Sequence, residues 1–286
     1  MDSAARLETD LRKRWIQAGL ILLNLVPVVL VTVGALFLLR HYHYSDAVSY
    51  LGSTAVCVAT YLAAVKWIER RVPAELSPNG VTALGAGALG GLALFSLVMT
   101  LLWLAGVYHV QRIGVGSFAS LGAGFTASLF AAITEEIWFR GLLFRMCARI
   151  LGTWGSLLLT SALFGAAHWI NPGATYATSL AIALEAGVLL GAAYAATGRL
   201  WLPIGLHFGW DFTESSLFGL NVSGSKHLSS LITGQLNGPH ILTGGSFGPE
   251  ASIAAVIVCL AAAAYLLWQM IKRRQVEQPV WSNRVT

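Results

Sequence analysis

The stretch ITEEIWFRG, residues 133–141, places Glu135, Glu136 and Arg140 inside a run that is otherwise apolar. FTASLFAA precedes it and LLF follows it. Ionisable side chains are costly in hydrocarbon, and chains that keep them there generally use them. What these three groups do therefore depends on whether the surrounding chain lies in a membrane.

The composition predicts an all-α, polytopic membrane protein in contact with the lipid bilayer. Of 286 residues, 56% are hydrophobic and only 11% are charged, whereas a soluble domain carries about 25% charged residues. The net charge of +5 does not indicate nucleic-acid binding, because the basic residues lie at the chain ends and in short connections. The three cysteines lie far apart in apolar runs, which is typical of small core residues.

Hydropathy divides the chain into about eight segments that we expect to span the membrane as helices. All but the fourth approach the roughly 17–25 residues that cross the hydrocarbon core. The fourth is too long for one straight span, and we expect an interfacial turn, a re-entrant turn or a break between Gly116 and Gly124. The segments are residues 15–39, 47–67, 82–107, 117–149, 154–170, 176–197, 201–219 and 250–271.

The basic residues predict the orientation in the cytoplasmic membrane. With the N-terminus in the cytoplasm and eight spans, the far side receives only Arg40, Arg112 and Lys226. Arg140 belongs to the polar stretch, and the other lysines and arginines fall on the cytoplasmic side, as the positive-inside rule expects. Both termini are therefore predicted to be cytoplasmic. The cytoplasmic set is Arg6, Arg12, Lys13, Arg14, Lys66, Arg70, Arg71, Arg145, Arg149, Arg199, Lys272, Arg273, Arg274 and Arg284.

We divide the chain into three parts. Residues 1–115 hold the N-terminal cytoplasmic segment and three spans, 116–219 hold the polar motifs, and 220–286 hold an extracytoplasmic loop, the last span and a tail. Residues 220–249 show no domain of their own.

Small residues four positions apart on a helix predict close packing of that helix against a neighbour. The pairs are Gly87 and Gly91, Gly187 and Gly191, and Gly205 and Gly209.

Helical spacing sorts the polar groups of the first motif. Glu136 and Arg140 are four residues apart, so they share a helix face and can form an ion pair. Glu135 points about 100° away from Glu136. It is therefore left as a carboxylate without an arginine, suited to exchange a proton. An alternative is that the ion pair only fixes helix packing, which would leave Glu135 unexplained.

Two later segments carry further polar groups. His207 and Asp211 are again four residues apart, in LHFGWDF, and Glu214 continues their face. His168 ends FGAAH, one turn after Phe164.

At 1.5 Å per residue, Glu135 lies roughly 21 Å along its helix from Arg149, and Asp211 roughly 18 Å from Arg199. The groups therefore reach similar depths, which predicts one buried polar cavity. Glu185 and Glu214 receive no role from this argument.

EEIWFRG, FGAAH and HFGWD resemble the EExxxR, FxxxH and HxxxN/D motifs of the CPBP family. This family, also called Abi, comprises type II CAAX prenyl endopeptidases and bacteriocin-processing and self-immunity proteins. The motifs occur in order and cover roughly residues 117–219. The resemblance implies an intramembrane endopeptidase acting on a peptide or membrane-protein substrate.

The resemblance implies a role for each matching position. Glu135 is similar to the essential glutamate of the first motif, and Glu136 and Arg140 match its second glutamate and its arginine. His168, after Phe164, matches the second motif, and His207 and Asp211 match the third. Asp211 stands where prenyl-protein endopeptidases often have asparagine, which does not favour a prenylated substrate.

Our interpretation is direct attack by water, because no serine or cysteine is placed convincingly beside a base. Glu135 would act as general base with help from His168, and His207, oriented by Asp211, would face the developing oxyanion. Glu136 and Arg140 would brace the helix. No cofactor is favoured. A zinc variant stays open, with His168, His207, Asp211 and Glu135 as ligands, although the chain has no HExxH.

Two other classes of protein remain open. A proton-coupled transporter would also use membrane-embedded Glu, Asp and His, although it would more often show internal repeats, which this chain lacks. A non-enzymatic immunity or scaffold protein would keep the same groups for packing. The sequence carries no signal for an oligomeric state.

Overall fold

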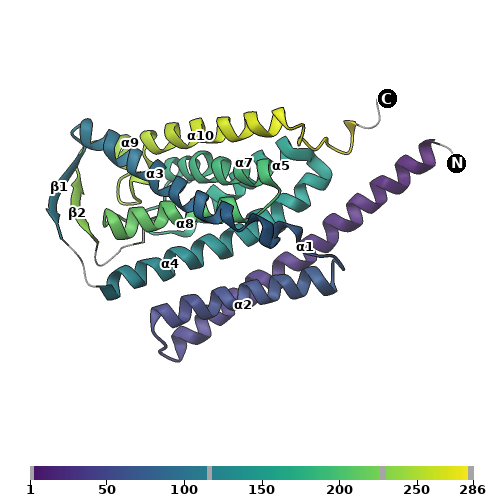
Figure 1. The fold of residues 1–286 in the computed structure, drawn as a ribbon, viewed down its shortest axis with the longest axis horizontal. Coiled ribbons are helices and arrows are strands. Elements are labelled where there is room, and N and C mark those ends of the chain that lie inside the picture. Colours follow the sequence, from purple (N-terminus) through teal and green to yellow (C-terminus); the bar gives the residue numbers. More distant parts are fainter. Residues whose placement is uncertain (1–2, 115–117, 226–229, 283–286) are drawn as a thin grey trace.

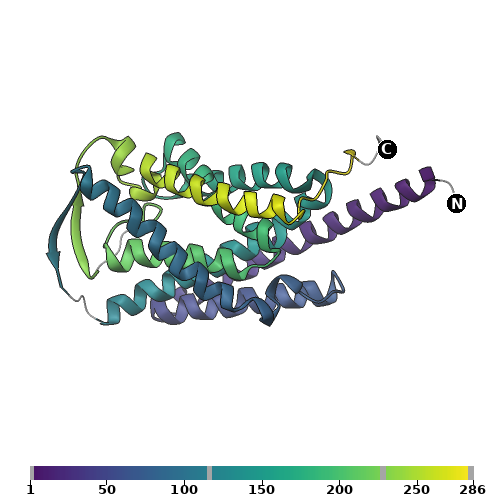
Figure 2. The same ribbon diagram turned by 45° about the horizontal axis from the view of Figure 1, so that its top comes forward.

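The computed structural model describes residues 3–114, 118–225 and 230–282, and within them the chain is a bundle of long helices. Helices cover most of the described part of each of the eight predicted segments. This confirms the all-α, polytopic class. Figures 1 and 2 show α1 and α2 side by side along one edge of the bundle, with the N-terminal half of α1 projecting beyond the other helices.

The first five predicted spans correspond to five helices, which are α1 (Ser3–His41), α2 (Asp46–Trp67), α3 (Thr82–Leu104), α4 (Phe118–Glu136) and α5 (Arg145–Ala167). A π-helix, Ile137–Phe144, joins α4 to α5 without a break. In the described residues, six stretches are long and apolar enough to cross a membrane, and Leu121–Ile170 is one of them, at 50 residues.

Later segments are interrupted by π-helical turns. α6 (Tyr176–Ile182) continues through a π-helix at Ala183–Gly187 into α7 (Val188–Thr197). α8 (Trp201–Phe212) ends in a π-helix at Thr213–Leu217. After a short α9 (His240–Thr243), α10 (Ile253–Lys272) closes the bundle. Short 3₁₀ turns cover Ala74–Leu76, Pro78–Gly80, His168–Ile170 and Pro249–Ala251.

The expected turn or break between Gly116 and Gly124 is wrong for the part of it that the structure describes. Gly116 lies outside the described residues, and from Phe118 onward α4 is continuous through Gly124. Gly124 faces Ser215 and Ser216, so the missing side chain makes room for a neighbouring helix.

The long segment is broken instead at Gly152, whose φ of 68° and ψ of −175° are not helical. Gly152 also leaves room for the segment that follows α10, because a Cβ there would stand 2.6 Å from the carbonyl oxygen of Glu277. The backbone N–H of Thr153 donates to that oxygen.

The predicted close packing of glycine helices is confirmed between α3 and α8. A Cβ added to Gly87 would stand 2.9 Å from the Cα of Gly205, and one added to Gly209 would meet the carbonyl oxygen of Ala88. Backbone thus lies directly against backbone where the two helices cross. This contact fixes the height of α8, which carries the third motif.

A small antiparallel ribbon follows α3 and was not predicted. β1 (Tyr108–Ile113) pairs with β2 (Ile232–Leu236), with a bulge between Val110 and Arg112. Only Tyr108 of β1 is buried, so the strand lacks the alternation that would reveal it in the sequence. The ribbon ties part of the 220–249 loop to the end of α3.

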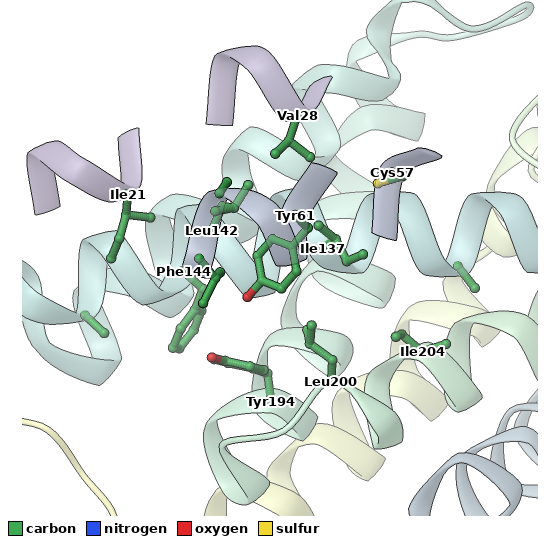
Figure 3. Packing of buried hydrophobic residues seen from close by; sticks show 14 of the residues in the cluster. Ile21, Val28, Cys57, Tyr61, Ile137, Leu142, Phe144, Tyr194, Leu200 and Ile204 are labelled. Carbon is green, nitrogen blue, oxygen red and sulfur yellow. The ribbon is translucent and has the colours of Figure 1, made fainter. Parts of the chain in front are cut away.

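Two large apolar cores and two smaller clusters pack within the described bundle. One joins α1, α2, the π-helix after α4 and α8, and Figure 3 shows Tyr61, Ile137, Leu142 and Leu200 converging there. The other joins α3, α7, α8 and α10 and includes Phe95 and Trp210, whose rings meet edge to face.

Candidate active site

Arg140 is the structural anchor of the first motif. Its side chain is 1% exposed, and Nη1 lies 2.8 Å from Oε1 of Glu136, which confirms the predicted ion pair. Nη2 donates to the backbone carbonyl oxygens of Ala186 at 3.2 Å and Gly187 at 3.1 Å. The guanidinium therefore fastens the α4 side of the site to the π-helix after α6.

Phe164 supports three charged or polar groups at once. The guanidinium of Arg140 lies over its ring, 4.7 Å from the centroid. The His168 ring is 4.6 Å away and the His207 ring 6.3 Å, centroid to centroid. Phe164 is 1% exposed, so it spaces these groups inside the bundle.

His207 is held from two helices. Its Nδ1 lies 3.0 Å from Oε1 of Glu136, the same oxygen that accepts from Arg140. Its Nε2 lies 3.5 Å from Oδ2 of Asp211, one turn further along α8. Because a carboxylate accepts and cannot donate, the ring donates from Nδ1, and Nε2 points toward the cavity.

His168 is held by its own helix end. Nδ1 lies 2.8 Å from the carbonyl oxygen of Phe164. A carbonyl oxygen only accepts, so Nδ1 carries the proton and the Nε2 of a neutral ring keeps its lone pair. That lone pair faces Glu135, whose Oε2 lies 3.9 Å from Nε2.

Glu135 occupies the centre of the arrangement. Its Oε2 lies 4.0 Å from Nε2 of His207 as well as 3.9 Å from Nε2 of His168. This oxygen is buried and has no hydrogen-bond partner among the described residues. Both separations are too long for a direct hydrogen bond and suit one bridging water.

Two cavities meet at Glu135 and His168. One, of about 370 Å³, also reaches His207, Asp211, Glu185 and Glu250. The other, of about 400 Å³, runs between α1 and the π-helix after α4, and it is walled mainly by apolar side chains. It includes Leu25, Val29, Trp138, Phe139 and Leu143.

The zinc variant gains no support from the arrangement of its side chains. Within the described parts of the chain, no group of three or more His, Cys, Asp or Glu side chains is gathered closely enough to hold one. The bond from His207 Nδ1 to Glu136 would also orient a zinc-bound imidazole, so it does not decide the question. We route no step through zinc.

The structure brings the sequence-predicted residues together. Glu135, His168, His207 and Asp211 line the first cavity, and Glu136, Arg140 and Phe164 support them from behind. Helical spacing assigned no role to Glu185 and Glu214, nor to Glu250, which lies in the 3₁₀ turn Pro249–Ala251 far along the chain. Glu185 and Glu250 line the first cavity with Asp211, and all three glutamates are at most 3% exposed.

Residues 117–213 match the family model described as Type II CAAX prenyl endopeptidase Rce1-like. The match confirms the resemblance carried by the three motifs and supports a membrane-embedded protease of the CAAX type. No curated protein and no solved structure matches the chain.

Proposed function

We propose that the chain is an intramembrane endopeptidase in which Glu135 activates a water molecule for direct attack on a peptide carbonyl. The observation that carries the proposal is the position of the unpartnered Oε2 of Glu135, 3.9 Å and 4.0 Å from two imidazole Nε2 atoms. A water bound there contacts a base and two ring nitrogens simultaneously.

The first step removes a proton from this water. Oε2 of Glu135 accepts one proton, and the Nε2 lone pair of His168 accepts a hydrogen bond from the other. The water oxygen then forms a bond to the scissile carbonyl carbon. Glu135 stays within reach, so the same carboxyl group returns the proton to the leaving amine when the C–N bond breaks.

The second requirement is a donor for the oxyanion. Nε2 of His207 faces the same space, and a positively charged ring donates from both nitrogens. Asp211 and Glu136 lie on its two sides at 3.5 Å and 3.0 Å, so both carboxyl groups fix the orientation of the ring. We assign oxyanion stabilisation to His207 and its orientation to Asp211 and Glu136.

The substrate class follows from the two cavities. The apolar cavity beside Glu135 suits a membrane-embedded segment or a lipid chain, and the first cavity suits polar peptide. Membrane-associated peptides, prenylated or unmodified, are therefore the proposed substrates. We place the enzyme in the cytoplasmic membrane with both termini in the cytoplasm, on the strength of the charge bias, and no step of this mechanism uses a metal.

The test is cleavage of a mixed peptide library, free and prenylated, by protein reconstituted in lipid. Glu135→Gln is compared with Glu277→Gln, an exposed glutamate that keeps its backbone hydrogen bonds. We expect cleavage by the wild type and by Glu277→Gln but not by folded Glu135→Gln. Equal product from all three at the background level would remove the peptidase and favour an immunity or scaffold protein.

A further inference from the structure

Beyond the proposed catalytic groups, the first cavity has an acidic wall. Glu185 comes from the π-helix after α6 and Glu250 from the 3₁₀ turn before α10, and both line the cavity next to Asp211. Glu214, on the π-helix after α8, is fully buried and does not line the cavity. We call Glu185 and Glu250 the acidic wall.

The protein itself satisfies little of this wall. Oε1 of Glu250 accepts from the backbone N–H of Ser223 at 2.7 Å and from its hydroxyl at 2.8 Å, which fixes that carboxylate in place. Oε1 of Glu185 accepts only from the thiol of Cys259, at 3.5 Å. A thiol is a weak donor, so Glu185 retains acceptor capacity.

Glu185 provides the sign of a missing partner. It is 3% exposed and lines the cavity, and among the described residues its hydrogen-bond donor is the Cys259 thiol. A buried carboxylate with so weak a donor is costly, and a cation that supplied stronger ones would relieve the cost.

The positive groups around the cavity do not neutralise the wall. Among the described residues that line the cavity, Arg40 is the one with a lysine or arginine side chain. It donates to the hydroxyl of Tyr50 and lies 3.6 Å from Asp46. His168 and His207 face Glu135. No group of three or more His, Cys, Asp or Glu side chains in the described residues is gathered closely enough to hold a metal ion. A cation that fits the wall is therefore a larger group that donates several hydrogen bonds.

We propose that the acidic wall binds a cationic group of the substrate, a lysine or arginine side chain or a free α-amine, close to the scissile bond. The inference rests on the proposed peptidase function and specifies its substrate class. An ammonium or guanidinium carries three or five donors, enough to bridge carboxylates that no metal ion could span.

Binding tests this without relying on catalysis. Glu135→Gln protein in lipid nanodiscs keeps the wall, and it is titrated with fluorescent neutral peptides that carry a single lysine, or norleucine at the same place. We expect lysine peptides to bind about tenfold or more tightly, as a charged hydrogen bond would give. The preference should fall in Glu135→Gln combined with Glu250→Gln or Glu185→Gln, and persist when Glu277→Gln is added.

Equal binding of both peptides, including no measurable binding of either, would overturn the inference. So would a lysine preference that survives both Glu250→Gln and Glu185→Gln. The peptidase is judged separately with wild-type protein. Cleavage of both peptides at equal rates would keep the peptidase and remove the cation site, whereas a lysine preference in binding without any cleavage would remove the peptidase alone.

Discussion

Nδ1 of His207 lies 3.0 Å from Oε1 of Glu136, although the two residues are 71 positions apart in the chain. The same oxygen pairs with Arg140. Glu136 is therefore more than half of a local ion pair, because it also sets the orientation of the ring that we assign to the oxyanion. Changes at Glu136 should affect both stability and catalysis.

Glu136→Gln removes the negative charge between two buried donors. Leaving Arg140 unpaired should lower the free energy of unfolding by about 3–5 kcal/mol, the usual cost of breaking a buried pair. Adding Arg140→Met should recover part of that stability but none of the cleavage, because His207 still lacks its carboxylate. Thermal unfolding and cleavage rates of the single and double variants separate the two roles, and recovery of cleavage in the double variant would contradict the role given to His207.

His168→Ala removes the proposed second contact of the water. The ring bonds only to the end of its own helix, so we expect a stability loss of about 1 kcal/mol. The cleavage rate should fall by about 10²–10⁴-fold, as expected for a group that assists proton transfer. Rate constants measured beside melting temperatures test this, and a rate loss that only tracks unfolding would refute it.

The α3–α8 crossing gives a matched pair of glycine variants. Gly209→Ala forces a Cβ against the backbone of Ala88 and should destabilise the protein by about 1–3 kcal/mol. Gly85→Ala, on α3 with open space around it, should be neutral or stabilising by up to about 1 kcal/mol. Equal thermal stabilities of the two variants would show that the helices do not approach this closely.

The loop after α2 contains a pH-dependent clamp. Burial alone would raise the pKa of Glu69, but bonds from Arg145, at 2.8 Å and 2.5 Å, and from Arg71, at 2.8 Å, outweigh it and lower the pKa. A lowered folded-state pKa means that the stabilisation is present above the unfolded value of about 4.3 and disappears as the pH falls through the folded value. Melting temperatures in acid should therefore fall more steeply for the wild type than for Glu69→Gln, and parallel curves would exclude the clamp.

Chelation tests the metal-free mechanism. Cleavage by protein treated with EDTA and passed into metal-free buffer should match that of untreated protein, since no proposed step uses a metal. Glu277→Gln protein, taken through the same EDTA treatment and buffer exchange, controls for loss of activity during handling. Loss of activity that added zinc restores would replace this mechanism with a metal-dependent one.

Local spacing in the sequence predicted much of the site. The pairs Glu136–Arg140 and His207–Asp211 follow from four-residue helical spacing, and both contacts are present. Similar depths on three helices predicted a shared cavity, and the cavity joins Glu135, His168 and His207. These features depend on periodicity and length, which a single sequence displays directly.

Sequence spacing does not reveal contacts between residues that are far apart in the chain. The bond from His207 to Glu136 depends on which faces of two helices meet, and the place of Glu250 depends on how a loop folds back toward Asp211. The sequence predicts a break between Gly116 and Gly124, whereas the structure has it at Gly152. Glycine alone does not tell the two sites apart, because it serves equally for a kink and for close packing. At Gly124 it allows packing, and at Gly152 it allows a positive φ.

The most direct test of the central claim is chemical rescue of Glu135→Ala. Glu135 lines two cavities, so its removal leaves space that a small carboxylate can reach. We predict that Glu135→Ala does not cleave the best library peptide, and that added formate restores cleavage in proportion to its concentration while leaving His168→Ala unchanged. Cleavage by Glu135→Ala at the wild-type rate without formate would contradict the assignment of Glu135 as the base.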